Sequence, residues 1–399
     1  MLSLRPSQLL AGSAAVLCTV VAASAGAVPC ADLNLPNPIY GVGGSAVTAT
    51  LRAVARVFAG LNPVPVTILY SDPNACTGFR QFVDNKIVGN FRYWDAAGVE
   101  SQCEPPAAGQ PADFSHMGNP AADCVGVTVP ANVKDFLAPV QTLNIIANTA
   151  SSETSISAEA LKVIYGRGAT RGVTPWVNEA VLARRQPTSF VQLFLGSAIG
   201  LSAESFLGVE YTTNGQVATA VHNATSPLAA IGFVSGSTAD ANRTGTNAVR
   251  TLAYQHTGQT CGFWPDSKDN TLDKINVRTG QYYLWASGHF FARVDGSGNA
   301  VNPNVRNLIG WFEGTIDSPA GSNVLRTVSL AGDIPQCAMQ VKREGLLGAI
   351  RSEPVSAPLV PCGCFFESVV GTTSCTACTS DAQCSGATPK CRYNFCEAY

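Results

Sequence analysis

The clearest structural pattern in the chain lies in IYGVGGSAVTATLRAVARVFAGLNPVPVTILY, residues 39–70. It opens with the apolar pair Ile39-Tyr40, enters a glycine-rich turn, and continues with apolar residues at helical spacing until Gly60. The β-branched run Val66–Tyr70 then predicts a second strand. Strand, turn, helix and strand in this order form a βαβ unit, so we expect an α/β fold.

Beyond this unit, alternating strand-like and helix-like segments continue to about residue 350. A second turn and a short helix follow the βαβ unit, with Phe79 and Phe82 facing inward. We expect one further helix to begin after Ser157, as its N-cap, and another at Pro187, in the first helical position.

Later parts of the chain are more irregular. Two strands are predicted at 282–285 and 288–294, and a hairpin turn at Asp295-Gly296. Residues 100–130 are rich in proline, alanine and glycine, and we interpret them as a long excursion closed by Cys103 and Cys124.

Composition excludes several classes of protein. The chain has 399 residues, of which 46% are hydrophobic and 13% charged, and its formal net charge is -2. A disordered chain would be less apolar, and a coiled coil would contain far more Glu, Lys and Arg. Because there is no basic run, we expect neither nucleic acid nor an anionic membrane as a partner. A folded protein with small or local partners is the prediction.

The first 25 residues have the pattern of a signal peptide. Arg5 precedes a mostly apolar stretch from Leu9 to Ala22, and small residues at 23–27 offer a cleavage site. The stretch is too short to span a bilayer, which needs about 20 apolar residues, and no later stretch of that length occurs. We therefore expect an exported protein, periplasmic or at the cell surface, without a transmembrane segment in the mature chain.

The 14 cysteines fall into three groups. One lies in the leader, six are dispersed through the body, and seven lie in residues 362–399, which we interpret as a separate disulfide-rich module. A zinc site at Cys375-x2-Cys378 is the alternative, but export favours disulfides. Thirteen mature cysteines cannot all pair within the chain. The disulfide candidates are Cys30, Cys76, Cys103, Cys124, Cys261, Cys337, Cys362, Cys364, Cys375, Cys378, Cys384, Cys391 and Cys396.

No pattern predicts a catalytic or metal site. The four histidines lack the spacing of metal ligands, and phosphate-loop, lipase-elbow and zinc-protease motifs are absent. We therefore predict a protein that is not an enzyme and that uses no cofactor.

Three segments could bind an anion. The turns at 41–45 and 74–78 each open a helix, so they present free backbone N–H groups. The pair Arg184-Arg185 precedes a helix start that carries Thr188 and Ser189. The structural alternative is that these are only tight turns, helix caps and an exposed arginine pair.

The order of four segments resembles the phosphate-type substrate-binding proteins of ABC transporters. The segments are Ile39–Ala46, Ile156–Gly166 with Val173–Trp176, Ala229–Val234 and Val277–Trp285. The resemblance implies a two-lobed periplasmic-binding-protein type 2 fold, with crossovers near 140–148 and 230–236 and a ligand between the lobes. The implied domains are a signal peptide (1–25), a binding domain (28–356) with one lobe at about 28–142 and 234–356 and the other at about 143–233, and the cysteine-rich module (362–399).

The resemblance also implies a set of ligand contacts. They are Ser45, Ala46, Thr77, Asp95, Arg185, Thr188 and Ser189. In this set Asp95 would accept a proton from a hydrogen-oxyanion. The chain departs from the family where its R-x-D-G-S-G-T loop is shortened to Arg185-Gln-Pro-Thr188, and where Ala75 replaces a serine beside Cys76, which we expect to pair with Cys30. Fewer donors than in the family are therefore left for phosphate.

The last segment resembles short cysteine-rich modules of bacterial surface proteins, such as those of myxobacteria, at Asp381–Cys384 and Lys390–Cys396. Our first hypothesis is an exported, non-catalytic protein that captures phosphate, another small anion or a polar solute between its lobes and works with an ABC permease or a cell-surface component. The alternative is a surface-displayed interaction or structural protein, in which the binding fold is a scaffold and the tail an attachment module.

Overall fold

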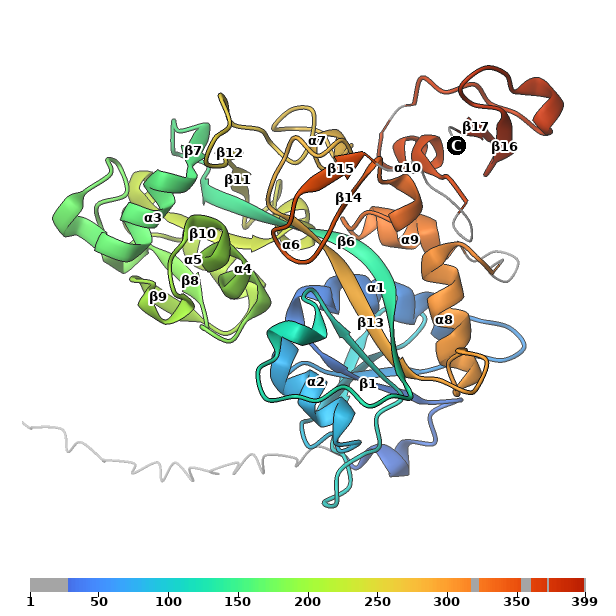
Figure 1. The fold of residues 1–399 in the computed structure, drawn as a ribbon. Coiled ribbons are helices and arrows are strands. Elements are labelled where there is room, and N and C mark those ends of the chain that lie inside the picture. Colours follow the sequence, from blue (N-terminus) through green and yellow to red (C-terminus); the bar gives the residue numbers. More distant parts are fainter. Residues whose placement is uncertain (1–27, 317–322, 353–359, 372, 398–399) are drawn as a thin grey trace, which may run out of the picture.

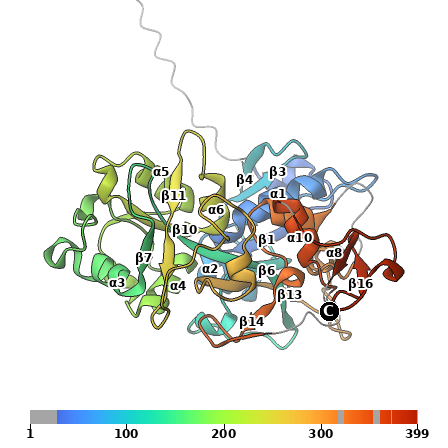
Figure 2. The ribbon, with the colours of Figure 1, turned by 90° about the horizontal axis from the view of Figure 1, so that it is seen from above.

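The computed structural model describes residues 28–316, 323–352, 360–371 and 373–397. The expected leader, residues 1–25, lies outside them. Figures 1 and 2 show two masses of helices and strands side by side, which we call the first lobe (β1, α1, α2, α8 and α9) and the second lobe (α3 to α6). The strand β6 (Val133–Asn148) is 16 residues long and runs through both of them.

A nine-stranded sheet connects the lobes. Its strand order is β10-β6-β13-β5-β1-β2-β3-β4, and β11 also pairs with β6. The other strands are β1 (Ile39–Gly43), β2 (Ile68–Ser71), β3 (Phe91–Trp94), β4 (Glu100–Cys103), β5 (Phe114–Met117), β10 (Ile231–Ser235), β11 (Val249–Thr251) and β13 (Trp285–Arg293). The fold is therefore α/β with two lobes, as expected from the sequence.

The predicted βαβ unit is present. β1 and β2 are parallel, with Ile39 opposite Ile68, and α1 (Thr48–Ala59) connects them. Leu51, Val54 and Phe58 are fully buried on the inner face of α1, because the large apolar residues of the helix gather on that face. This unit forms the centre of the first lobe.

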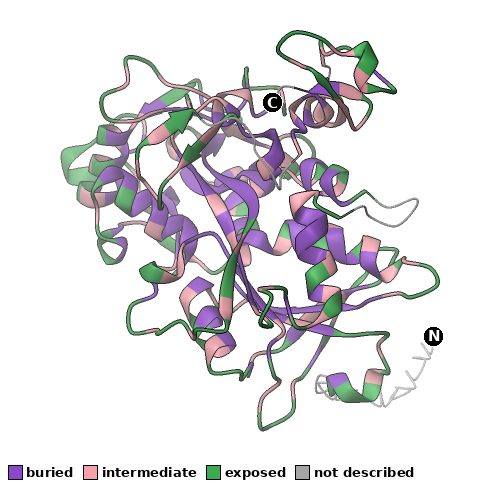
Figure 3. Ribbon diagram, turned by 45° about the vertical axis from the view of Figure 1, so that its right-hand side comes forward, coloured by how far each residue is buried: buried purple, intermediate pink, exposed green. Residues whose placement is uncertain are grey.

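Helices cover both faces of the sheet in the first lobe. The residues of α1, α8 (Pro303–Glu313) and α9 (Val324–Leu330) share one apolar core, whereas α2 (Ala75–Val83) packs in another. Neighbouring residues of β13 divide between them, since Phe290 belongs to the first core and Phe291 to the second. Figure 3 shows this burial along the central strands.

The segment 100–130 is not the long excursion that we expected. It contains β4 and β5, and β5 lies in the middle of the sheet between β1 and β13. All four residues of β5 are buried, so the strand shows no alternation of apolar and polar residues. Because Ser115 and His116 are polar, the segment has no apolar run that would predict a buried strand.

The expected disulfide pairings in the first lobe are wrong. Cys30 bonds Cys103, and Cys76 bonds Cys124. The N-terminal segment lies along the end of β4, where the N–H of Cys30 donates to the carbonyl of Glu104 at 2.9 Å, and this pairing brings Cys30 to Cys103. The spacing of the cysteines in the sequence does not predict that Cys30 and Cys103 lie close together.

The second lobe holds the helices and short strands that follow β6. They are β7 (Ser155–Ser157), α3 (Ala158–Arg167), β8 (Ala183–Arg185), α4 (Phe190–Ile199), β9 (Val209–Tyr211), α5 (Asn214–His222), α6 (Gly236–Ala241) and β12 (Ala253–Gln255). Both β11, which pairs with β6, and β12, which pairs with β7, belong here, so this lobe extends beyond residue 233.

Helix starts in the second lobe agree with the sequence only in part. Ser157 caps α3 by accepting the N–H of Ala160 at 3.1 Å, as predicted. In contrast, α4 begins at Phe190 with Ser189 as its N-cap, so Pro187 precedes the helix. The strand expected at 288–294 belongs to β13, which begins at Trp285 and pairs irregularly between Ser287 and Gly288. Residues 282–284 are not in a strand, so the strand expected at 282–285 is wrong except for Trp285.

The C-terminal segment is fastened to the first lobe. A Cys337–Cys362 disulfide leads into α10 (Gly363–Val370), and Arg278 at the end of α7 (Ile275–Arg278) forms an ion pair with Glu367 at 2.9 Å. The carboxylate of Glu397 accepts the first N–H groups of α10 at 3.0 Å. The last described residues thus close back onto this helix.

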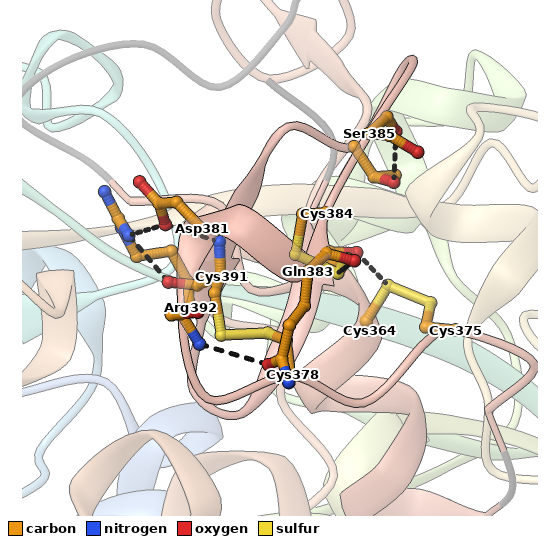
Figure 4. The surroundings of a disulfide bond; sticks show 12 residues. Cys364, Cys375, Cys378, Asp381, Gln383, Cys384, Ser385, Cys391 and Arg392 are labelled. Atoms are coloured by element: carbon orange, nitrogen blue, oxygen red, sulfur yellow. Dashed lines mark hydrogen bonds and ion pairs between the residues drawn. A yellow bond between two sulfur atoms is a disulfide. The ribbon is translucent and has the colours of Figure 1, made fainter.

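The remaining tail is stabilised mainly by disulfides. Three of them, Cys364–Cys375, Cys378–Cys391 and Cys384–Cys396, close loops with separations of 11 to 13 residues. Figure 4 shows their surroundings, in which Asp381 accepts hydrogen bonds from the backbone of Cys391 and from Arg392. The hairpin β16 (Lys390–Arg392) and β17 (Phe395–Glu397) completes the tail, and β14 (Val341–Arg343) and β15 (Ile350–Ser352) form a second hairpin before α10.

In this oxidised form the tail cysteines cannot act as zinc ligands. The sulfur atoms of Cys378, Cys384 and Cys396 lie within 4.8 Å of one another, but each is in a disulfide and offers no thiolate. Cys261 is the free thiol among the described cysteines, and it is exposed. None of the described helices is long and apolar enough to cross a membrane.

Candidate functional site

A small cavity lies where the two lobes meet. Its walls are the loops after β1 and β2, the segment from β8 into α4, and the residues before α5. The lining residues are Gly44, Ser45, Ala46, Asp72, Pro73, Asn74, Ala75, Arg185, Gln186, Ser189, Phe190, Val191 and Thr212. The cavity volume is about 20 Å³, which is room for about one water molecule.

Parallel strands from both lobes end at this cavity. β1 and β2 are parallel in the first lobe, and β8 and β9 are parallel in the second. The carboxyl ends of parallel strands share one edge, and the segments that follow them begin with N–H groups that have no partner within a helix. The topology therefore directs several backbone donors toward one place.

Close packing of glycines shapes the part of the cavity lining that comes from the first lobe, which we call the first wall; the part from the second lobe is the second wall. A Cβ atom on Gly43 would lie 2.0 Å from the carbonyl oxygen of His116, and one on Gly78 would lie 2.5 Å from the Cα of Gly43. The end of β1 and the helix α2 can approach this closely only because Gly43 and Gly78 lack a side chain. This approach places Gly44 and Ser45 beside Ala75 at the start of α2.

Arg185, the last residue of β8, is the charged centre of the second wall. It is only 2% exposed. Its Nε donates to the carbonyl of Tyr211 at 3.2 Å, Nη1 to Oδ1 of Asn214 at 2.6 Å, and Nη2 to the carbonyl of Thr212 at 2.6 Å. Nη2 also reaches across to Oγ of Ser45 at 3.3 Å. All four acceptors are neutral.

The charge of Arg185 is therefore not balanced by a direct partner. No carboxylate in the described chain lies within ion-pair distance of its guanidinium. Burial lowers the pKa of Arg185 to about 10, although the more distant Asp72 acts in the opposite direction. It remains a cation at neutral pH. A buried cation held by neutral dipoles attracts an anion.

Asp72 is the carboxylate at the cavity. It forms an ion pair with Arg92 at 2.8 Å and accepts the hydroxyl of Thr48 at 3.0 Å. Burial raises its pKa above the ordinary value, while Arg92 and Thr48 oppose this rise. Because Asp72 is paired with Arg92, the net charge of the cavity walls comes from Arg185.

The structure brings four of the seven predicted contacts together. Ser45, Ala46, Arg185 and Ser189 line the same cavity. Thr77, Thr188 and Asp95 do not line it, and all three are exposed. Asp95 lies in the turn between β3 and β4, where its Oδ1 accepts the N–H of Val99 at 2.8 Å. The binding role of the four convergent residues stays a prediction.

Sequence reasoning missed two residues that shape the site. Asp72 stands just before the second glycine-containing turn, in Ser71-Asp72-Pro-Asn74, where a search for anion donors passes over an acidic side chain. Asn214 holds Arg185 and in turn donates to Ser235 at 3.2 Å. The capping box that starts with Thr213 marks the beginning of α5, and this signal could have pointed to Asn214.

A buried acid lies behind the first wall. Gln141 of β6 donates to the carbonyl of Ala46 at 3.3 Å, and the hydroxyl of Thr50 in α1 donates to Asp333. Asp333 is 2% exposed, and burial raises its pKa to about 7 despite the hydrogen bonds from Thr50 and Gln141. These contacts fasten the loop after β1 to the strand that joins the lobes.

Comparisons with known proteins find similar structures of low sequence identity. A protein from Clostridium perfringens, assigned as a phosphate ABC transporter substrate-binding protein and solved with bound phosphate, has a TM-score of 0.49 and 13% identity over 75% of this chain and 99% of its own. An ABC-type phosphate transport receptor from Vibrio cholerae has a TM-score of 0.45 and 15% identity over 74% and 99%. The OxyR regulatory domain of Pseudomonas aeruginosa has a TM-score of 0.39 and 9% identity over 69% and 93%.

No protein-family model matches the chain, and no curated protein matches it. The similar structures include binding proteins and a regulatory domain, so what this chain binds has to be argued from its own cavity.

Proposed function

We propose that this protein is an exported, non-catalytic binding protein that holds a small anion between its two lobes. The observation that carries the proposal is Arg185, which is a cation, 2% exposed, without a carboxylate at ion-pair distance among the described residues, and at the wall of the interlobe cavity. An anion would supply the missing negative charge.

Backbone dipoles act in the same direction as Arg185. The lining includes the starts of α2 and α4 and the short helix η2 (Ser45–Val47) that leads into α1. Helix N-termini carry partial positive charge and stabilise anions. Ser45 and Ser189 add hydroxyl groups that can donate to oxygen atoms. Together these groups suit a carboxylate or an oxyanion.

The charge balance favours an anion with one negative charge. The pair Asp72–Arg92 is neutral overall, which leaves the single charge of Arg185. A second negative charge on the ligand would lie close to the carboxylate of Asp72 and be repelled. Phosphate in its monoanionic form is one candidate, and transfer of the bound anion to an ABC permease is the partner role that goes with it.

Export is supported by the oxidised cysteines. Twelve cysteines form the six disulfides of the described residues. Such bonds persist in the periplasm and outside the cell, whereas cytosolic thiols are kept reduced. The sequence pattern of residues 1–25 is the leader that this location requires.

A thermal-shift screen with phosphate, sulfate, nitrate and small carboxylates tests the proposal. We expect at least one anion to raise the melting temperature of the protein, and Arg185→Ala to abolish the rise. Arg184→Ala is the matched control, because Arg184 is bound to Glu210 at 2.6 Å and does not line the cavity. If no anion shifts the unaltered protein, or if both variants respond equally, anion capture by Arg185 is wrong.

The alternative function is surface attachment through the tail. It is favoured by the Cys337–Cys362 disulfide and the Arg278–Glu367 ion pair, which fasten the tail to the first lobe more firmly than a mobile linker would. Removal of residues 371–399, with Cys364→Ser to avoid a free thiol, separates the two functions. Loss of cell-surface retention with unchanged anion binding would assign attachment to the tail, whereas unchanged retention would exclude it.

A further inference from the structure

One side chain of the second lobe fills part of the cleft. Phe190, the first residue of α4, lines the cavity and is only 6% exposed. Its ring stacks on Phe194 of the same helix with centroids 5.6 Å apart. On the other side it meets Gly118, which follows β5 in the first lobe. A Cβ atom at Gly118 would lie 2.5 Å from a carbon of the Phe190 ring.

A second contact crosses the cleft at the same place. Nη2 of Arg185 donates to Oγ of Ser45 at 3.3 Å, from the second lobe to the first. One apolar and one polar contact therefore join the lobes around the cavity, and both belong to the protein itself.

The space between these contacts is too small for the proposed ligand. A volume of about 20 Å³ accommodates about one water molecule, whereas phosphate and sulfate each have five heavy atoms. An anion of that size needs more room beside Arg185, and the cavity gains it if the lobes separate or if the Phe190 ring, which lines the cavity, moves away.

We propose that the cleft closes on itself. The contact of Phe190 with Gly118 and the hydrogen bond from Arg185 to Ser45 hold the two lobes together. An anion then binds only after the Phe190 ring has moved away. This inference rests on the proposed function. It assigns to Phe190 the control of access to the site, because the ligand and the ring compete for the same position. The apparent affinity is then reduced by the small fraction of molecules in which the ring is withdrawn.

Two substitutions disturb the closed cleft in different ways. Phe190→Ala removes the ring, so we expect a more open cleft and an apparent anion affinity at least about tenfold higher. Gly118→Ala adds a methyl group where the ring lies, so we expect it to hold the lobes apart. In the Phe190→Ala background the methyl group meets no ring, and Gly118→Ala should then have no further effect on the cleft.

Pulsed electron paramagnetic resonance measures the opening directly. Nitroxide labels on Lys86→Cys, after α2, and Lys162→Cys, in α3, report the distance between the lobes, with Cys261→Ser to remove the free thiol. Gly296→Ala is the control glycine variant, because a Cβ atom there meets nothing within 4 Å. Thermal unfolding confirms that each variant folds, and calorimetric titration with phosphate, sulfate and acetate gives the affinities.

The expected result is a short distance without added anion, a longer one in Gly118→Ala and Phe190→Ala, and no change in Gly296→Ala. A long distance that shortens only when phosphate is added would overturn self-closure and leave the proposed function intact. An equal effect of Gly118→Ala with and without Phe190 would overturn the role of the ring. If the distances are as expected but none of the three anions binds to the unaltered protein or to Phe190→Ala, self-closure stands and the proposed function is wrong.

Discussion

Asp333→Asn should make the protein more stable at alkaline pH. Asp333 is buried behind the loop after β1, and burial raises its pKa from 3.8 to about 7. The folded protein therefore holds a proton on Asp333 between these pH values, whereas the unfolded chain has released it. The stability that this proton contributes is fully present below about pH 3.8 and is lost as the pH rises through about 7.

The size of the effect follows from the pKa difference. A rise from 3.8 to about 7 corresponds to about 4 kcal/mol in the free energy of unfolding. Asparagine has no proton to lose and can still accept the hydroxyl of Thr50. We expect Asp333→Asn to leave stability unchanged near pH 4 and to raise it by up to about 4 kcal/mol at pH 8.

Guanidinium unfolding of both proteins at pH 4, 6 and 8, with the disulfides intact, measures this difference. Subtracting the two curves removes the pH dependence of all other groups, because they are common to both proteins. A difference that stays constant from pH 4 to pH 8 would show that folding does not raise the pKa of Asp333.

Three further predictions concern other parts of the molecule. His116 is 1% exposed, and burial lowers its pKa to about 3. As the pH falls below about 6.5 the unfolded chain takes up a proton on this histidine and the folded protein does not, so the free energy of unfolding decreases. His116→Phe should lose about 2 kcal/mol less of this free energy between pH 6.5 and 5 than the unaltered protein, as measured by unfolding. Ser157→Ala removes the N-cap of α3 and should lower the free energy of unfolding by about 1 kcal/mol, while calorimetry shows unchanged anion binding. Replacing Cys337 and Cys362 by serine opens a loop with a separation of 25 residues and should lower the free energy of unfolding by about 3.5 kcal/mol. Limited proteolysis of this variant should release the tail first. Initial cleavage in another part of the protein would contradict this prediction.

The parts of the fold that the sequence predicted are those with a local signal. In residues 39–70 each step of the βαβ unit has its own pattern, namely a glycine turn, a helical stripe and a β-branched run. The N-cap of α3 at Ser157 is also visible locally. Such features depend on a few neighbouring residues, so no knowledge of the tertiary structure is needed.

The features that were missed depend on contacts between distant segments. β5 is a central strand because β1 and β13 pair with it, although Phe114–Met117 has no strand pattern of its own. The pairing of Cys30 with Cys103 follows from the path of the N-terminal segment along β4. In the same way, Asp72 lies at the cavity because β2 ends there. Asp95 follows β3, which is antiparallel to β2 and ends at the opposite edge of the sheet.

Crystals grown with arsenate show whether the interlobe cavity binds an anion, because arsenate has the shape of phosphate and its arsenic atom gives an anomalous signal. We expect one strong anomalous peak between the lobes, within hydrogen-bond distance of the Arg185 guanidinium, with the Phe190 ring moved away from Gly118. Crystals of Arg185→Ala should lack the peak. A peak on another surface, or an unchanged cavity at saturating arsenate, would contradict the claim that this cleft binds a small anion.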